Sequence, residues 1–280
     1  MCYTCTMRGL VLAGGGARGA YQAGVLKYLL HDLQLHFDFI SGVSVGALNA
    51  AAIGQFSHGQ EKEASNYLLD IWLDTRAVNV FKSNKLRDYI QNKSLYNTRP
   101  LADTIKKYLD TEKLLNSDKT IIVSATEHRT KVLREFYGSD RMILSAILAS
   151  AAIPILFPPI YLEGRYYLDG GVREIVPVNT LKARGCTEII SIVPTPKHKA
   201  IKAPSRFPSF TELVTRSVNL VIGDINEDDL LDHLVIRPDN TLTENALDFS
   251  QDLIVDMIAQ GYQDAKEQYH AYYTANPSQN

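Results

Sequence analysis

The chain is organised around the stretch Phe37-Asp38-Phe39-Ile40-Ser41-Gly42-Val43-Ser44-Val45-Gly46. A short apolar run ends in Gly-x-Ser-x-Gly, and a helical segment of small residues, Ala47 to Ile53, follows at once. A strand, a tight turn that holds a serine, and a helix form the context of a nucleophile elbow. The turn strains the serine backbone, and flanking glycines remove the Cβ atoms that would clash there. The stretch therefore predicts Ser44 as a catalytic nucleophile, against the alternative of an ordinary turn serine.

The length and composition are those of an ordinary globular protein. The 280 residues are 45% hydrophobic and 21% charged, which is enough to bury a core as one large domain or two modest ones. The formal net charge of -2 gives no overall field that would attract nucleic acid, so no such partner is expected. Three cysteines do not indicate a disulfide framework, and Cys2 and Cys5 lack the second pair of a typical metal site.

No targeting or membrane-spanning segment is predicted. The first six residues are not basic, and no cleavage site follows the apolar run that ends at Ala13. The longest apolar run, Ala146 to Ile160, is interrupted by three prolines. The expected location is therefore the cytoplasm or the surface of a membrane.

A glycine-rich loop follows the first predicted strand, residues 9–13. Gly14-Gly15-Gly16-Ala17-Arg18-Gly19 precedes a predicted helix over residues 20–31, so its backbone amides form an anion site. A dinucleotide fingerprint would need an acidic residue at the end of the second strand, where Ser44 stands instead. The amides of Gly14, Gly15 and Gly16 are therefore predicted to form an oxyanion hole. Arg18 either anchors this loop or binds a phosphate headgroup, and both roles stay open.

The rest of the chain alternates strands and helices without a repeat or a linker. Strands are predicted over residues 120–126, 132–137, 165–168, 188–193 and 233–237, and helices over 61–75, 145–152, 177–183, 210–223 and 249–273. Another helix is predicted to begin with Thr98 as its N-cap. The alternation predicts one α/β domain over residues 1–280, with a helical cap-like insertion at 57–118 and a C-terminal helical part at 205–280.

Residues 76–107 carry eight basic side chains against two acidic ones, with aromatic residues such as Phe81, Tyr89 and Tyr96 between them. This pattern fits a solvated helix face. It also fits a cap over the active site that touches an anionic membrane surface.

Two further motifs follow later in the chain, Ala149-Ser-Ala-Ala-Ile-Pro154 and Asp169-Gly-Gly171. Taken alone, Asp-Gly is a common hairpin turn signal. Together with the glycine loop and Gly42-Val-Ser44-Val-Gly46, however, the four motifs in this order resemble the patatin-like phospholipase family. The resemblance implies a three-layer α/β/α fold with a mostly parallel central sheet. It also implies acyl hydrolysis by a Ser44–Asp169 dyad, an oxyanion hole at Gly14 to Gly16, and a substrate wall near Ile153 and Pro154.

The residues support a dyad independently of the resemblance. A Ser-His-Asp hydrolase of the common α/β type needs a late histidine on a loop beyond a strand. His198 lies in a lysine-rich loop, His233 begins a predicted strand, and His270 lies on the terminal helix, so none is well placed. Asp169 precedes two glycines and can approach a serine closely, where its carboxylate would accept the Ser44 proton.

The predicted reaction is attack of Ser44 on an ester carbonyl with Asp169 as base, without a metal or another cofactor. The acidic run 224–232 lacks the pattern of an EF-hand and is interpreted as a solvated turn. An aspartate base predicts activity that persists below pH 6 unless burial raises its pKa. The expected substrate is a phospholipid or lysophospholipid. The alternatives are a soluble ester or thioester hydrolase, an acyltransferase with the same dyad, and a non-catalytic lipid-binding module.

Overall fold

Five short apolar runs form the parallel part of a central sheet in the computed structural model, which describes residues 7–84, 94–197 and 224–277. In their order across the sheet they are β10 (Leu234–Ile236), β9 (Glu188–Ile192), β1 (Arg8–Leu12), β2 (Phe39–Val43) and β5 (Thr120–Glu127). Each is parallel to its neighbour. Their near-continuous apolar sequence fits strands that are covered on both faces.

Three antiparallel strands extend the sheet beyond β5. They are β6 (Leu133–Tyr137), β7 (Ile160–Leu162) and β8 (Arg165–Asp169). β5 pairs with β2 up to Ser124, which lies opposite Val43, and then with β8 from Ala125, which lies opposite Asp169. Because two successive residues of β5 face the ends of β2 and β8, these two strand ends meet. This junction brings Ser44 and Asp169 together from positions far apart in the sequence.

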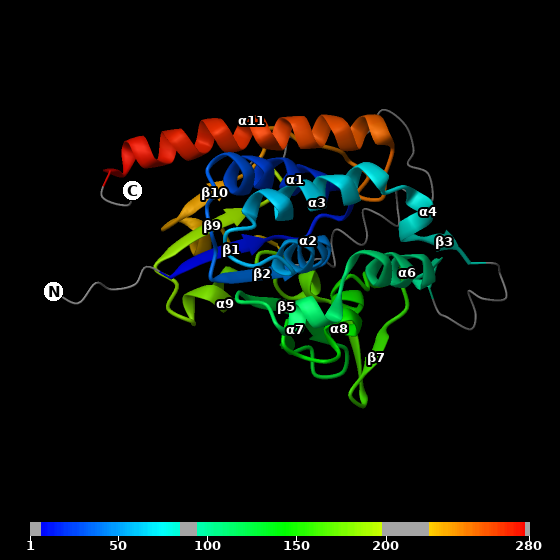
Figure 1. Cartoon of the computed structure of the whole chain (residues 1–280). Coiled ribbons are helices and arrows are strands. Elements are labelled where there is room, and N and C mark those ends of the chain that lie inside the picture. Colours follow the sequence, from blue (N-terminus) through cyan, green and yellow to red (C-terminus); the bar gives the residue numbers. More distant parts are fainter. Residues whose placement is uncertain (1–6, 85–93, 198–223, 278–280) are drawn as a thin grey trace.

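Helices cover both faces of the sheet. On one face lie α1 (Gly19–Leu26), α2 (Val45–Gly54), α3 (Glu61–Asp74) and α11 (Gln251–Ala275), and Figure 1 shows α11 lying across α1. Leu10 and Leu12 share the core with these helices, whereas Val11 packs against α9 (Val178–Lys182) on the other face. The prediction of an α/β fold with a mostly parallel sheet flanked by helices is confirmed.

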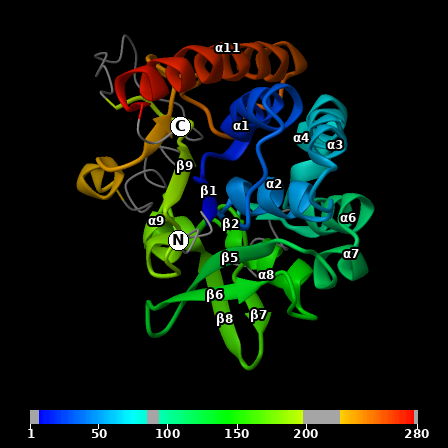
Figure 2. The ribbon, with the colours of Figure 1, turned by 60° about the vertical axis from the view of Figure 1, so that its left-hand side comes forward.

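The segment between α3 and β5 adds short elements beside the sheet. They are α4 (Ala77–Val80), β3 (Lys82–Ser83), β4 (Tyr96–Asn97), α6 (Arg99–Tyr108) and α7 (Thr111–Leu115). Leu101 and Ile105 of α6 are buried in the same core as α1 and α2. α8 (Ile143–Ser150) lies between β6 and β7 in the sequence, and Figure 2 shows β6, β7 and β8 at the end of the sheet away from α11.

Several local predictions differ from the structure. The helix expected over residues 20–31 changes at Lys27 into a π-helix, Lys27–Asp32. Thr98 is the N-cap residue of α6 as predicted, but its side chain accepts no capping hydrogen bond, and Asn97 Oδ1 accepts one from the Arg99 amide at 2.7 Å. Asp169-Gly170 is not a hairpin turn, since β8 runs into a 3-10 turn, Gly170–Val172. Cys2, Cys5, Lys85, Arg87, Tyr89, His198 and the helix predicted over 210–223 lie outside the described residues.

Candidate active site

Ser44 occupies a strained turn between β2 and α2. Its φ of 55° and ψ of -127° place it among the few non-glycine residues with a positive φ. A Cβ atom on Gly46 would lie 2.0 Å from the Leu12 carbonyl oxygen, so only glycine lets α2 begin this close to β1. The serine thus stands at the N-terminus of α2, where the helix dipole favours negative charge.

Asp169 ends β8 and is fully buried. Its Oδ1 accepts a hydrogen bond from the Gly171 amide at 2.7 Å. Its Oδ2 is buried and has no hydrogen-bond partner among the described residues. Burial raises the pKa of Asp169 to about 7, while the nearby Ser44 hydroxyl and the Gly171 amide limit this rise. The free oxygen and the raised pKa suit a carboxylate that takes up the Ser44 proton.

The end of α8 holds both of these residues. Ser150 Oγ accepts a hydrogen bond from the Ser44 amide at 2.9 Å and donates one to the Ser124 carbonyl at 2.7 Å. Two residues later, the Ala152 carbonyl accepts a hydrogen bond from the Asp169 amide at 2.9 Å. The sequence predicted a substrate wall near Ile153 and Pro154 and a helix of small residues before it, but not these contacts of Ser150 and Ala152. Because Ser150 and Ala152 are only two residues apart where α8 ends, their contacts fix the serine and the aspartate relative to each other.

The glycine loop lies directly beside the serine. A Cβ atom on Gly14 would lie 3.3 Å from the Ser44 Cβ. The Gly14 amide donates a hydrogen bond to the Ile175 carbonyl at 3.0 Å, which differs from the expectation that all three amides face the oxyanion. The amides of Gly15 and Gly16 have no acceptor among the described residues. These two amides are the candidate oxyanion donors that remain.

An apolar pocket opens at Ser44. Its walls come from α2, α3, α6 and the segments after α8 and before α11, and the lining side chains include Leu48, Leu68, Ile71, Ile105, Ile153 and Phe249. About 830 Å³ of space lies between these walls, part of it open to solvent. Polar wall residues other than Ser44 bond to the protein, as Thr104 Oγ1 does when it donates to the Asn79 carbonyl at 2.7 Å. The pocket therefore offers an almost wholly apolar surface to a ligand.

The other predicted binding residues differ in whether they line the pocket. Ile153 lines the pocket, whereas Pro154 and Arg18 are not among the lining residues. Arg18 is buried in the 3-10 turn Gly16–Arg18, and its Nε has no partner among the described residues. Burial lowers the pKa of its guanidinium, and the charge of Glu244 opposes this. Phe157, which the sequence did not single out, also lines the pocket.

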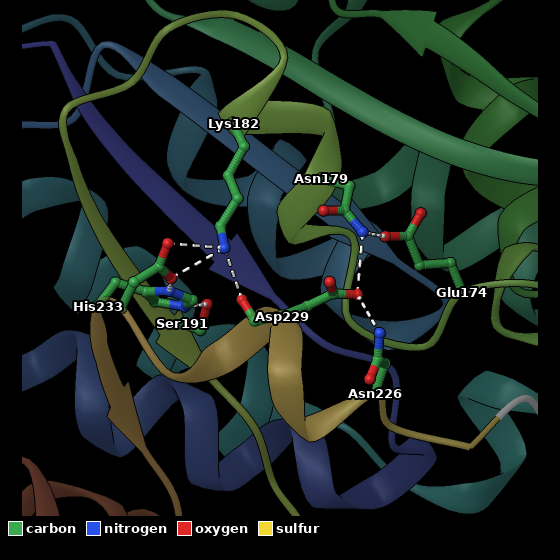
Figure 3. A network of polar contacts seen from close by, with 8 residues as sticks. Glu174, Asn179, Lys182, Ser191, Asn226, Asp229 and His233 are labelled. Atoms are coloured by element: carbon green, nitrogen blue, oxygen red, sulfur yellow. Dashed lines mark hydrogen bonds and ion pairs between the residues drawn. The ribbon is translucent and has the colours of Figure 1, made fainter.

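No histidine lines the pocket within the described part of the chain. His233 instead lies in a polar network on the α9 face of the sheet, shown in Figure 3. Its Nε2 lies 2.8 Å from Ser191 Oγ and its Nδ1 lies 3.0 Å from Asp232 Oδ1. Ser191 has no exposed surface, so a substrate cannot reach this Ser-His-Asp arrangement. Lys182 also binds Asp232, which ties the acidic segment 224–232 to α9.

Within residues 7–84, 94–197 and 224–277, no group of three or more His, Cys, Asp or Glu side chains is placed to hold a metal ion. Over the same ranges, no helix has both the length and the apolar character needed to span a bilayer.

Comparison with known families gives a match over the residues that build this site. The sequence profile described as patatin-like phospholipase matches residues 10–182. Triacylglycerol lipase ptl2 of Schizosaccharomyces pombe is 29% identical over 198 residues, which are 62% of this chain and 31% of ptl2. Lysophospholipase nte1 of Aspergillus terreus is 26% identical over 66% of this chain and 12% of its own length. The uncharacterized protein YjjU of Escherichia coli is 28% identical, over 67% of this chain and 52% of YjjU. The chain thus spans from about an eighth to about half of these relatives.

Solved structures with a similar course of the chain include VipD from Legionella pneumophila. It has a TM-score of 0.49 and 15% identity, over 95% of this chain and 67% of VipD. Human GIVD cytosolic phospholipase A2 has a TM-score of 0.39 and 13% identity, over 94% of this chain and 59% of that chain.

Proposed function

The chain belongs to the patatin-like phospholipase family, and we propose that it hydrolyses acyl esters of phospholipids or lysophospholipids with a Ser44–Asp169 dyad. One observation carries the proposal. The strained Ser44 lies at an apolar pocket and beside a buried carboxylate with an unpartnered oxygen. An acyl chain is the substrate group that such a pocket would bury with the largest gain in free energy.

The proposed reaction has two halves. Asp169 Oδ2 accepts the Ser44 proton as the serine oxygen bonds to the ester carbonyl carbon, and the carbonyl oxygen becomes an oxyanion. The amides of Gly15 and Gly16 and the N-terminus of α2 stabilise this charge. The C–O bond to the leaving alcohol then breaks, and the alcohol takes the proton from Asp169. Water repeats the sequence on the acyl-enzyme, which releases the fatty acid and restores both residues.

The cap-like segment 57–118 has a defined role in this proposal. It supplies α3 and α6, whose apolar side chains form the wall opposite α2, so the acyl chain would lie between the sheet domain and this segment. Arg76, Lys82 and Arg99 are exposed, and they stand next to Thr75, Val80 and Leu101 of the pocket lining. We therefore propose that this surface rests on anionic lipid while a chain enters the pocket.

Two alternative roles stay open for Arg18, and one substitution measured on two substrates distinguishes them. Its burial and the nearby Glu244 favour an anchor for the glycine loop, whereas its unpartnered Nε favours contact with a phosphate. Arg18→Gln would lower hydrolysis of a lysophospholipid more than that of a neutral ester if Arg18 binds the headgroup. An equal loss on both substrates would assign it to the loop alone.

The test of the proposal is a lipid panel in which released fatty acids are identified by mass spectrometry, with wild type compared with Ser44→Ala. We expect release from phospholipids or lysophospholipids by the wild type only, with a sharp rise in rate when the substrate forms micelles. Activity on monomeric esters or thioesters without this rise would favour the soluble hydrolase. Binding of lipid without release would favour a non-catalytic module.

A further inference from the structure

Three buried polar side chains connect the wall of the pocket to the glycine loop. Trp72 of α3 donates from Nε1 to Asn49 Oδ1 at 3.0 Å, and Asn49 of α2 donates from Nδ2 to Gln22 Oε1 at 2.8 Å. Gln22 of α1 donates from Nε2 to the Ala13 carbonyl at 2.7 Å. All three side chains are at least 96% buried. The series therefore runs through three helices and ends at the residue that precedes the glycine loop.

The direction of this series is fixed by chemistry. An indole N–H can only donate, so the Asn49 oxygen must face Trp72 and the Asn49 amide nitrogen must face Gln22. The Gln22 amide nitrogen is then turned toward Ala13, where it can only donate to the carbonyl. A second bond from Asn49 Nδ2 to the Gly19 carbonyl, at 3.1 Å, uses the remaining amide hydrogen. No member of the series can flip without leaving a buried polar group unpaired.

The end of the series holds one particular peptide group. The peptide between Ala13 and Gly14 accepts from Gln22 through its carbonyl, and it donates to the Ile175 carbonyl at 3.0 Å through the Gly14 amide. Both sides of this peptide plane are thereby fixed. The next two amides, of Gly15 and Gly16, are those proposed to bind the oxyanion, so their direction depends on this plane.

We propose that Gln22, Asn49 and Trp72 are positioning residues that hold the glycine loop in its oxyanion-binding conformation. The inference rests on the proposed function, because it presupposes that the loop stabilises an oxyanion. A buried apolar cluster would fill the same space without requiring paired polar atoms. A hydrogen-bonded series instead specifies one orientation of the loop, which hydrophobic packing alone does not.

The first test uses Gln22→Met, which keeps the length of the side chain and removes the donor to Ala13. Gln22 does not line the pocket, so substrate binding is not directly altered. On p-nitrophenyl acetate and butyrate we expect kcat to fall by about 10- to 100-fold, as for other small misplacements of catalytic groups, with KM within twofold. Inactivation by a fluorophosphonate should slow to a similar degree, because its phosphonyl oxygen would occupy the same hole.

Tyr21→Phe is the matched control. Tyr21 is the neighbouring residue on α1, is fully buried, and donates its hydroxyl hydrogen bond to Asp264 of α11 at 2.8 Å. The control loses a partly buried hydrogen bond from the same helix, but not one to the glycine loop. We expect its kcat to stay within twofold of the wild type even where its thermal unfolding midpoint falls.

Trp72→Phe tests the far end of the series and serves if Gln22→Met does not fold. It removes the indole donor and keeps an aromatic wall, and it should lower kcat on p-nitrophenyl acetate, whose two-carbon acyl group leaves most of the pocket empty. In the double variant the two losses should not multiply, because both act through one series. Folded variants with wild-type kcat, or losses that multiply fully, would overturn the inference. Absence of Ser44-dependent hydrolysis in the wild type would instead overturn the proposed function.

Discussion

At the scale of single residues, the burial of Asp169 has two opposite consequences: it lowers the stability of the folded protein and strengthens the carboxylate as a base. A fully buried carboxylate destabilises the folded protein when it is ionised, and that same burial raises its pKa to about 7 and makes it a stronger base. In the folded protein Asp169 therefore holds its proton to a higher pH than in the unfolded chain, where its ordinary value is 3.8. Its contribution to stability accordingly falls as the pH rises from about 4 to about 7, and the cost above pH 7 is on the order of 4 kcal/mol.

Asp169→Asn separates these two consequences. Asparagine keeps the acceptor for the Gly171 amide but cannot take up the serine proton, so kcat should fall by at least about 10²-fold. Because asparagine is neutral at every pH, the unfolding midpoint of the variant relative to the wild type should rise between pH 5 and pH 8. Calorimetry at both pH values checks this. A variant with near wild-type activity, or a midpoint difference that is independent of pH, would contradict the assigned role of Asp169.

The pH profile follows from the same carboxyl group. The expectation from the sequence, that activity persists below pH 6, rests on the ordinary pKa of an aspartate and is revised by its complete burial. We now expect kcat/KM on a soluble chromogenic ester to fall as the pH drops through about 7. A histidine base would give an acid limb at a similar pH, because the ordinary pKa of histidine is about 6.5. The profile should therefore be measured beside His128→Gln and His233→Gln, which we expect to stay within a few-fold of the wild type. An acid limb well below pH 6 would contradict the raised pKa.

At the scale of elements, the end of α8 contacts both members of the proposed dyad. Ser150 holds the Ser44 amide, and the Ala152 carbonyl holds the Asp169 amide. Removing the Ser150 hydroxyl leaves the buried Ser44 N–H and Ser124 carbonyl without this partner. The surrounding contacts hold Ser44 in its strained backbone conformation. Without the Ser150 hydroxyl, the Ser44 side chain should therefore be less well placed for attack.

Ser150→Ala should lower kcat by about 10-fold, with a smaller effect on KM, because a displaced nucleophile weakens the reaction more than binding. Ser145→Ala, an exposed serine on the same helix, is the control and should behave as the wild type. Steady-state kinetics on a soluble ester, with the unfolding midpoint of each variant, provide the measurement. Equal kcat in both variants would show that α8 does not support the dyad.

Contiguous motifs explain what the sequence could predict at this scale. Strand, glycine turn and helix around Ser44 are set by neighbouring residues, as are the glycine loop and the end of β8 at Asp169. The junction of β2 and β8 along β5 joins residues that are more than 100 positions apart. The same holds for the contact of Ser150 with Ser44. No local pattern carries such pairings, and the capture of the Gly14 amide by Ile175 likewise depends on packing.

At the scale of the whole molecule, the pocket and its surroundings decide where the protein would act. An acyl chain must leave a lipid aggregate to enter the space between α2, α3 and α6. Of the basic residues in 76–107, five lie in the described part and are exposed: Arg76, Lys82, Arg99, Lys106 and Lys107. Lys107 is paired with Asp74 at 2.9 Å, which leaves the other four for contact with anionic lipid.

Replacing Arg76, Lys82 and Arg99 with glutamine should weaken sedimentation with anionic vesicles and slow their hydrolysis. Each basic residue near such a surface contributes on the order of 1 kcal/mol, and salt screens the attraction. Hydrolysis of a short soluble ester should not change. The matched control replaces Arg129, Lys131 and Arg165, which are exposed around the turn between β5 and β6 and at the start of β8. Equal losses in both triple variants, or no preference of the wild type for anionic vesicles at low salt, would contradict docking by this surface.

Covalent labelling shows whether Ser44 is the nucleophile of the molecule. The protein is treated with a fluorophosphonate, digested, and analysed by peptide mass spectrometry. We expect one adduct, on the peptide that contains Ser44, slower labelling of Asp169→Asn, and none in Ser44→Ala. Labelling that persists in Ser44→Ala, or an adduct on Ser191 beside His233, would contradict the assignment of Ser44 as the nucleophile.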